Sequence, residues 1–362
     1  MRKNLQTIML WMISLLALTG CDVHEFPEES HIRVPFTLYL DFHTDLPLYK
    51  EIIYTRGVEE GNSDYDIRYI IHAYRTDNKR SETRQADTTF VFTKSDLSNL
   101  DYTAQLELRE GSYDFKVWAD YVKKGSRQDC FYDTQDFSEI ILAGKQNYRG
   151  SNDYRDAFRG YATAKVANPA FYTGEAAEAI DNRATAKMVR PMGKFKFIAS
   201  DVDAFMGSLG LHVPGRDASG GWEDPDSKAA YEQFLQNFQW GEYTVRFKYN
   251  IFMPCSFNMF TDKPADSWTG MSFVSNIQVE RNHEICLGFD YAFVNGSETT
   301  LSISLELYDK EGELLSSTNP INVPIVRSKL TIVRGDFLTI KASGGVMINP
   351  GYDGEDFNIE IY

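Results

Sequence analysis

The sequence repeatedly alternates apolar and polar residues with a period of two. The stretch "TLSISLELY" at residues 300–308 has apolar side chains at four odd-numbered positions, and "VPFTLYLDF" at residues 34–42 has them at five even-numbered positions. Successive side chains of a strand point to opposite faces, so this period predicts half-buried strands. Antiparallel sheets can expose one face to water. Many short strands of this kind predict an all-β fold of antiparallel β-sandwiches.

A long break in the alternation divides the chain. Residues 146–190 mix glycine, asparagine and aromatic residues with an Ala-rich charged stretch, and strands restart after Pro191. We therefore expect two tandem domains, a β-sandwich at residues 34–190 and a second one at residues 191–362.

Local patterns within each half predict particular elements. Residues 102–121 alternate on both sides of Glu110-Gly111, which predicts a hairpin that turns there. Residues 227–238 follow a turn-rich loop and predict a short helix in the second domain, with Asp226 or Ser227 as its cap. The alternation also predicts the core side chains: Leu106 and Leu108 in the first sandwich, and Ile303 and Leu305 in the second.

The first twenty residues have the form of a secretory signal. A basic start at residues 2–3 and an apolar run of about ten residues end at Leu18-Thr19-Gly20-Cys21. The run is too short to span a bilayer comfortably, and its ending resembles a bacterial lipobox. We expect residues 1–20 to be removed, Cys21 to carry a lipid, and the polar residues 21–33 to form a tether. An ordinary signal peptide with a chance cysteine is the alternative.

Charge limits the classes of partner. The chain of 362 residues has a formal net charge of −15, which becomes −17 (−15 − 2) when the two basic residues of the signal are removed. Nucleic acids and anionic lipids bind clustered Lys and Arg, so the sequence excludes a nucleic-acid partner. No later apolar run approaches the length of a membrane span, and the membrane contact that we expect is the N-terminal lipid only.

Cysteine usage predicts no disulfide framework. Besides Cys21, the chain has Cys130, Cys255 and Cys286. Three thiols cannot all pair within one chain, although an exported protein could form disulfides. Whether any two of them pair stays open.

The sequence has no motif for catalysis or for a cofactor. It lacks G-x-S-x-G, H-E-x-x-H, Walker and dinucleotide patterns, and its six histidines do not have metal-ligand spacing. Acidic loops at residues 217–226 and 349–356 contain the oxygen ligands that calcium takes, but without EF-hand spacing, so we interpret them as solvated turns. We therefore expect no catalytic residue, no metal site and no cofactor. A hydrolase that uses the carboxylates of residues 217–226 is a remote alternative.

Three tryptophans in the second half are candidates for stacking on sugars. The candidates are Trp222, Trp240 and Trp268, and Trp222 is the best of them because it lies among turn-forming residues in a loop. Packing in a core or between domains is the favoured interpretation for all three.

The C-terminal region carries a longer pattern. The stretch "INVPIVRSKLTIVRGDFLT" at residues 321–339 resembles the terminal signature of the Bacteroidales type V fimbrillins, "(V/I)P(V/I)xRNxxTxxxGxxLT". The matching residues are Val323, Pro324, Arg327, Leu330, Thr331, Gly335, Leu338 and Thr339. Ser328 stands where that family usually has Asn. The ending at residues 344–361 and the stretch "LREGSYDFKVWADY" are also similar to that family, and "CDVHEFPE" is similar to related Bacteroidales lipoproteins.

This resemblance implies two transthyretin-like β-sandwiches that assemble by β-strand exchange after export to the outer membrane as lipoproteins. In polymerising members, an Arg-specific protease removes the lipidated N-terminus with the first strand, and a strand of the next subunit fills the groove. Anchor members are implied to keep their lipid. Here the segment after the first strand contains Arg56-Gly57 as a candidate cleavage site, and a plain loop arginine is the alternative.

The last residues are the candidate donor strand. Phe357, Ile359 and Ile361 alternate with polar residues, so their side chains share one face of a strand. Such a strand could fill a neighbour's groove, or it could be a structural end strand of its own domain.

Together these observations predict a fimbrial-type lipoprotein, lipid-anchored at the outer membrane and displayed on the cell surface, with no enzymatic activity. The expected partners are other fimbrial subunits, and a host protein or glycan is a further candidate. The alternative function is a glycan-binding outer-membrane surface lipoprotein that uses loop aromatics. The sequence does not distinguish tip, stalk and anchor.

Overall fold

The computed structural model describes residues 32–42, 64–76, 85–216, 221–222, 224 and 226–340, together with the backbone of residues 357–361. Most regular structure in these residues is β-strand, in sheets whose neighbouring strands are mostly antiparallel. The predicted all-β fold class is confirmed. Among the described residues, no helix is both long and apolar enough to cross a membrane.

Two sheets face each other in the first half of the chain. One has the strand order β4-β1-β9, and the other has the order β3-β2-β5-β8. Leu106 and Leu108 are 2% and 1% exposed in the cluster between the sheets, as predicted. The strands are β1 (Arg33–Asp41), β2 (Tyr65–Arg75), β3 (Thr88–Lys94), β4 (Tyr102–Arg109), β5 (Gly111–Lys123), β8 (Ala157–Val166) and β9 (Arg183–Lys187).

A second pair of sheets follows. One has the order β17-β18-β10-β22-β23, and the other has the order β16-β11-β19-β20, with β21 also paired to β19. Ile303 and Leu305 are 1% and 2% exposed in the second core, as predicted. The strands are β10 (Met192–Ala199), β11 (Thr244–Tyr249), β16 (Ser272–Asn276), β17 (Gln278–Val279), β18 (Ile285–Phe293), β19 (Glu298–Tyr308), β20 (Leu314–Ser317), β21 (Ile321–Val326), β22 (Leu330–Gly335) and β23 (Phe357–Ile361).

The two pairs of sheets share a pattern of strand pairing. β1 lies between antiparallel β4 and parallel β9, and β10 lies likewise between antiparallel β18 and parallel β22. In the facing sheets, β2 lies between β3 and β5 as β11 lies between β16 and β19. β23 has no counterpart among the described strands of the first half, because it extends its sheet beyond β22.

Residues 124–156 connect β5 to β8 and cross to the second core; we name them the crossing segment. In it, β6 (Tyr132–Asp133) and β7 (Ile140–Leu142) join β13 (Ser256–Asn258) and β14 (Lys263–Pro264) in one sheet, while β12 (Met253–Pro254) pairs with β15 (Ser267–Trp268). Tyr132, Phe137 and Ile140 are buried in the second core. The predicted domain boundary at residues 190/191 stays a prediction. The crossing segment precedes that boundary in the sequence, but its side chains pack in the core of the second half.

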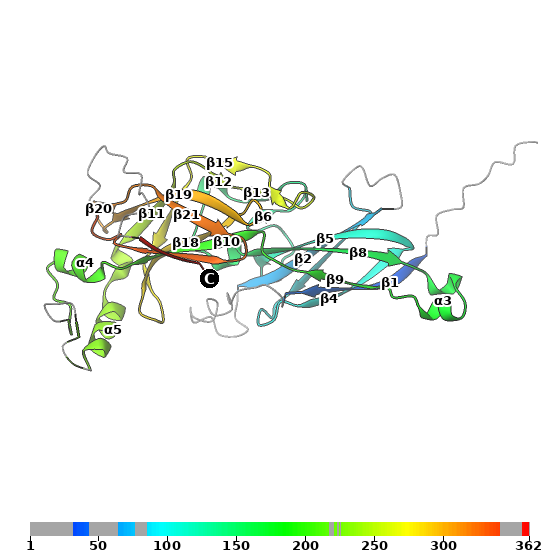
Figure 1. The fold of residues 1–362 in the computed structure, drawn as a ribbon, viewed down its shortest axis with the longest axis horizontal. Helices are drawn as coiled ribbons and strands as arrows, with labels where there is room; N and C mark the ends of the chain where they lie inside the picture. Colours follow the sequence, from blue (N-terminus) through cyan, green and yellow to red (C-terminus); the bar gives the residue numbers. More distant parts are fainter. Residues whose placement is uncertain are drawn as a thin grey trace, which may run out of the picture.

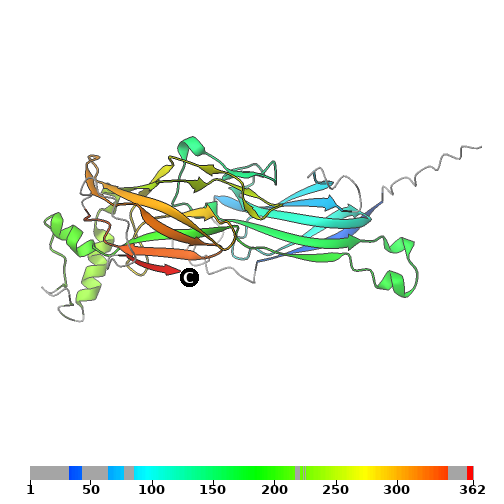
Figure 2. The same ribbon diagram turned by 45° about the horizontal axis from the view of Figure 1, so that its top comes forward.

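Helices lie at the two ends of the elongated molecule (Figure 1). Figure 2 shows α3 (Glu175–Glu178) at one end and α4 (Val202–Ser208) and α5 (Ser227–Asn237) at the other. Short 3-10 turns are η2 (Lys145–Asn147), η3 (Asp153–Arg155), η4 (Pro169–Phe171) and η5 (Trp240–Glu242).

Helix α5 confirms the predicted helix, and its N-cap residue is Asp226, one of the two residues that the sequence suggested. The side chain of Asp226, however, accepts no capping hydrogen bond. The Asp224 carboxylate instead accepts from the N–H groups of Asp226 at 2.8 Å and Ser227 at 3.0 Å. An acceptor two residues upstream satisfies these free N–H groups equally well.

The hairpin predicted at residues 102–121 is also wrong. β4 pairs with β1, whereas β5 pairs with β2 and β8. The turn at Glu110-Gly111 therefore carries the chain from one sheet to the sheet that faces it, with Gly111 at a φ of 151°. Alternation on both sides of a turn identifies two strands, but it does not identify their hydrogen-bonding partners.

Candidate functional site

β1 is the central strand of its sheet and fills one side of the first core. Its inward side chains Val34, Phe36, Leu38 and Leu40 are 4%, 1%, 0% and 1% exposed. Phe36 stacks on Phe115 of the facing sheet, with ring centroids 5.2 Å apart. Among the described residues, β4 and β9 hydrogen-bond to no strand but β1. Removal of β1 would therefore leave unpaired backbone groups on two strands and an apolar groove between them.

The C-terminal end of β1 is held on three sides. The N–H of Phe42 donates to Asp101 at 3.0 Å, the Phe42 ring packs edge-to-face on Phe158 at 5.1 Å, and the carbonyl of Asp41 accepts from Met188 at 2.8 Å. The candidate cleavage site Arg56-Gly57 and the candidate lipidation site Cys21 both lie outside the described residues.

The candidate donor strand pairs within its own sheet. In β23, Phe357 lies opposite Gly335, Ile359 opposite Val333 and Ile361 opposite Thr331, in antiparallel register with β22. β23 is the outermost strand of this sheet. In the single chain β23 is therefore an edge strand that hydrogen-bonds to one neighbouring strand, whereas β1 hydrogen-bonds to two.

Trp222 differs from the other two tryptophans that the sequence suggested for sugar stacking. Trp240 and Trp268 are 4% and 8% exposed and pack in the second core, as the favoured interpretation predicted, whereas Trp222 is 40% exposed. Trp222 lies in the connection between α4 and α5, at the end of the molecule where these helices lie.

The indole ring of Trp222 packs against neighbouring side chains. The Arg216 guanidinium lies 4.0 Å from the ring centroid, and Tyr231 packs edge-to-face at 5.4 Å. Arg216 also pairs with Asp203 at 3.2 Å. Burial and the hydrogen bond to Asp203 raise the pKa of Tyr231 to about 12, so its hydroxyl stays protonated. The result is an aromatic surface, partly open to solvent and flanked by charged groups, of the kind that stacks on sugars.

A polar cleft of about 1180 Å³ lies over β2 and β3. His72 stacks on Phe137 at 3.7 Å in its lining, and burial lowers the pKa of His72 to about 4, so the ring is neutral at pH 7. The sequence gives one local signal for this cleft, the pair Arg68 and His72 on the even-numbered face of an apolar strand, and that signal alone does not predict a cleft. Its exposed polar lining consists of Gln85, Thr89, Arg127, Gln128, Asp129, Gln135 and Asp136.

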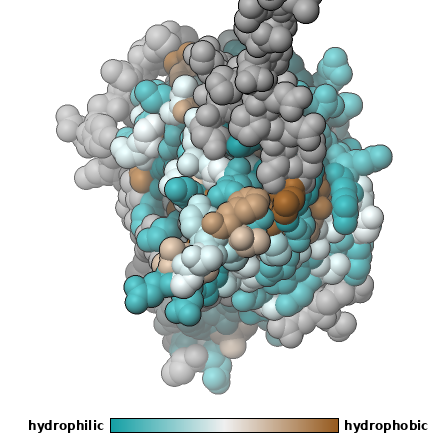
Figure 3. Space-filling model, turned by 90° about the vertical axis from the view of Figure 1, so that its right-hand side faces the viewer, coloured by the Kyte–Doolittle hydropathy of each residue, from teal (hydrophilic) through white to brown (hydrophobic). Residues whose placement is uncertain are grey.

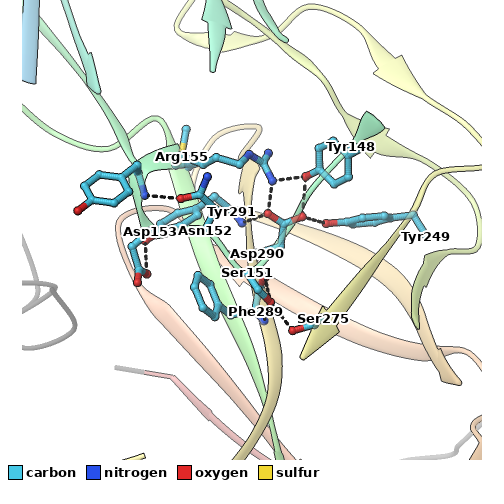
Figure 4. Close-up of polar contacts among 12 residues, drawn as sticks. Tyr148, Ser151, Asn152, Asp153, Arg155, Tyr249, Ser275, Phe289, Asp290 and Tyr291 are labelled. Atoms are coloured by element: carbon cyan, nitrogen blue, oxygen red, sulfur yellow. Dashed lines mark hydrogen bonds and ion pairs between the residues drawn. The ribbon is translucent and has the colours of Figure 1, made fainter. Parts of the chain in front are cut away.

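Figure 4 shows a polar cluster centred on Asp290, which is 0% exposed. Asp290 pairs with Arg155 and accepts from the hydroxyls of Tyr148 at 2.5 Å and Tyr249 at 2.6 Å. Burial acts to lower the pKa of Arg155, but the charge of Asp290 outweighs it and raises that pKa, so Arg155 stays charged. Arg155 and Tyr148 belong to the crossing segment. Asp290, Arg155 and Tyr249 are buried, so their contacts tie the crossing segment to β11 and β18.

The signature residues that carry the fimbrillin resemblance make structural contacts. Arg327 donates to the Asp262 carboxylate at 2.7 Å and to the carbonyls of Asp262 at 3.0 Å and Val294 at 2.8 Å. Asp262 also binds Arg159 of β8, with contacts of 2.7 and 2.9 Å. Ser328 has a left-handed φ of 59°. Asn adopts that conformation more readily than Ser does, which accounts for Asn as the usual residue of the signature.

The structure shows Cys130, Cys255 and Cys286 as free thiols. Burial raises the pKa of Cys255 to about 12, so this thiol is protonated and unreactive at neutral pH. Within the described ranges, no group of three or more His, Cys, Asp or Glu side chains could hold a metal ion.

Comparisons with solved structures and protein families add the following. A candidate cell adhesion protein from Bacteroides ovatus is 12% identical, with 91% of this chain and 96% of that chain covered and a TM-score of 0.44. The fimbrial anchor protein Mfa2 from Porphyromonas gingivalis is 10% identical, with 83% and 90% covered and a TM-score of 0.37. A candidate polysaccharide-binding protein (DUF1812) from Bacteroides thetaiotaomicron is 10% identical, with 79% of each chain covered and a TM-score of 0.41. No curated protein matches the chain. The model of a family of unknown function (DUF6562) matches residues 34–362, and the chain belongs to that family.

Proposed function

We propose that this chain is a fimbrial-type surface lipoprotein, anchored in the outer membrane through Cys21, that acts as a structural or adhesive component and has no enzymatic activity. The observation that carries the proposal is the position of β1. It is the central strand of a three-stranded sheet, its inward side chains are at most 4% exposed, and it lies between Cys21 and Arg56 in the chain. The sequence resemblance at both ends of the chain supports the same proposal.

The proposed assembly step is an exchange of strands between subunits. The lipid on Cys21 would anchor the chain before assembly. A cut after Arg56 would then release residues 21–56, with the lipid and β1, and an extended segment with alternating apolar residues would refill the groove. The tail at residues 357–362 has this alternation. It leaves an edge with one neighbouring strand and enters a groove with two, so the exchange increases the number of backbone hydrogen bonds that it makes.

Cleavage is tested with Arg56→Ala in the native host. We expect loss of the shortened subunit on immunoblots of purified surface filaments, and loss of filament incorporation in electron micrographs probed for this chain. Arg149→Ala is the matched control, because Arg149 is an exposed arginine outside the candidate sites and, like Arg56, precedes a glycine in the sequence. Filaments that incorporate the Arg56→Ala chain normally would show that assembly does not depend on this cut.

The donor role is tested by deletion of residues 357–362. We expect a folded, lipidated monomer that forms no polymers. Normal filaments from the deletion strain would rule out the donor role. An unfolded deletion protein would identify the tail as a strand that stabilises its own sheet.

Glycan binding is the second candidate function, and two observations favour it. Trp222 presents a partly exposed indole beside Arg216, and the cleft over β2 and β3 is lined by amide, guanidinium and carboxylate groups, which are the usual hydrogen-bonding partners of sugars. Polysaccharide binding that is lost on Trp222→Ala would assign the α4–α5 end, and binding that is lost on Gln135→Ala would assign the cleft. Leu314→Ala is the control at an exposed apolar residue outside both sites.

A further inference from the structure

The end of the molecule that carries α3 has an apolar patch. We name it the tether-end patch and define it as the exposed residues Ile32, Ala170, Phe171, Ala176 and Ala179. Phe171 and Ile32 are 58% and 54% exposed, which is high for large apolar side chains. Figure 3 faces this end and shows apolar side chains gathered near its middle, with hydrophilic ones around them.

Separate segments of the chain build this patch. Phe171 comes from η4, which lies against α3 in the connection between β8 and β9. Ile32 precedes β1, and the parallel register of β1 and β9 places Thr37 opposite Arg183. The start of β1 therefore lies beside the residues that follow α3. Phe171 is the second most exposed large apolar residue among the described residues, after Ile251 at 64%.

The length of the tether indicates what covers the patch. Ten residues, 22–31, separate Cys21 from Ile32. Eleven peptide units reach at most about 40 Å when fully extended. A lipid on Cys21 would therefore keep this end of the fold close to the bilayer, at a local concentration on the order of millimolar. At that effective concentration, even a weak contact between apolar side chains and the bilayer is populated.

We propose that the tether-end patch docks on the lipid surface, with Phe171 in the interface between headgroups and acyl chains. Exposed charges of both signs lie beside the patch, with Arg33, Lys165 and Arg183 against Glu107, Glu175, Glu178 and Asp181. The contact is therefore apolar and fits zwitterionic lipid better than strongly charged lipid. It adds a second membrane contact to the lipid that the sequence predicts, and two signals anchor more firmly than one.

This contact would orient the molecule on the membrane. The α4–α5 end, which carries Trp222, lies opposite the tether-end patch (Figure 2). Docking would direct that end away from the bilayer, where partners reach it. The inference rests on the proposed lipidation of Cys21 and applies to the uncut chain.

The test uses the full lipidated chain in vesicles of phosphatidylcholine and phosphatidylethanolamine. Phe171→Trp adds a fluorophore at the patch, and Leu314→Trp adds one at an exposed apolar residue (52% exposed) on β20, near the opposite end. The emission of each variant minus that of the unsubstituted chain is recorded with and without doxyl-labelled lipid. We expect the emission added at Phe171 to shift to shorter wavelength and to lose most of its intensity to the quencher. The emission added at Leu314 should change in neither respect.

Three other outcomes would overturn the inference. Chains that float with the vesicles while the added emission at Phe171 is unquenched would refute docking and leave lipid anchoring intact. A shift without quenching that depends on protein concentration would show that a second copy of the chain covers the patch. Chains that do not float with vesicles would remove the basis of the inference together with the proposed lipidation.

Discussion

Replacement of Asp290 by Asn tests how strongly the crossing segment is fastened to the second core. Asp290 is 0% exposed and is the partner of Arg155, whose side chain is 5% exposed. Asn keeps the shape of the side chain and one carbonyl acceptor for the hydroxyls of Tyr148 and Tyr249. It removes the negative charge, so the Arg155 guanidinium is left buried without a counter-ion.

The expected cost is large for a single atom exchange. Removal of one partner of a buried ion pair destabilises a protein by roughly 3–5 kcal/mol, because the remaining charge is uncompensated. Natural domains have free energies of unfolding of about 5–15 kcal/mol, so Asp290→Asn should remove a large part of the total. Glu242→Gln is the matched control, because Glu242 pairs with Lys310 at the surface, with side chains 39% and 56% exposed. Exposed pairs contribute about 0–1 kcal/mol.

Urea denaturation of the mature chain, followed by tryptophan fluorescence, measures both variants. Trp268 packs on Tyr148 with ring centroids 6.4 Å apart, so its emission reports on the cluster. The double substitution Arg155→Met with Asp290→Asn should recover part of the lost stability, because it removes both charges and keeps a carbonyl acceptor for the hydroxyls of Tyr148 and Tyr249. A loss below about 1 kcal/mol for Asp290→Asn would refute the argument that the buried pair fastens the crossing segment.

Three further predictions concern the cores, the cleft and the anchor. Leu106→Ala and Ile303→Ala should each lower the free energy of unfolding by roughly 2–5 kcal/mol, because both side chains are at most 2% exposed. Denaturant titrations measure this change, and a decrease no larger than that of a substitution at an exposed residue would contradict the prediction. The pKa of His72 is lowered by burial to about 4 from its ordinary 6.5, so the unfolded chain binds the extra proton between these values. The stability that neutral His72 contributes is therefore complete above pH 6.5 and is lost as the pH falls toward 4, and His72→Gln should flatten that part of the stability profile. Cys21→Ser should release the protein or leave it as the precursor, and mass spectrometry that finds an unmodified N-terminus at another residue of the native chain would disprove lipidation.

Long-range pairing explains where the sequence analysis was wrong. Residues 102–121 were expected to form a hairpin, because two alternating runs flank a Glu-Gly turn. The alternation correctly placed Leu106 and Leu108 in a core, since it depends only on which face of a strand is apolar. It contains no information on whether β5 pairs with β4 or crosses to β2, because both arrangements bury the same side chains.

The candidate sites also differ in whether local sequence or long-range packing forms them. Local sequence suggested Trp222, whose turn-rich surroundings were a signal for exposure. The cleft over β2 and β3 had almost no local signal, because its lining comes from β2, β3 and the crossing segment. The same holds for Asp290, whose partners Arg155 and Tyr249 are 135 and 41 residues away along the chain.

The sequence by itself determined the strand content, the inward faces of the strands and helix α5, because these follow from side-chain periodicity over a few residues. Only the tertiary structure decided that β1 is a central strand with an antiparallel and a parallel neighbour, that β23 is an edge strand, and that the crossing segment completes the second core. These features depend on contacts between distant residues, whose pairing is chosen by the packing of the whole chain. The proposed strand exchange and the proposed membrane contact of the tether-end patch both depend on this second kind of information.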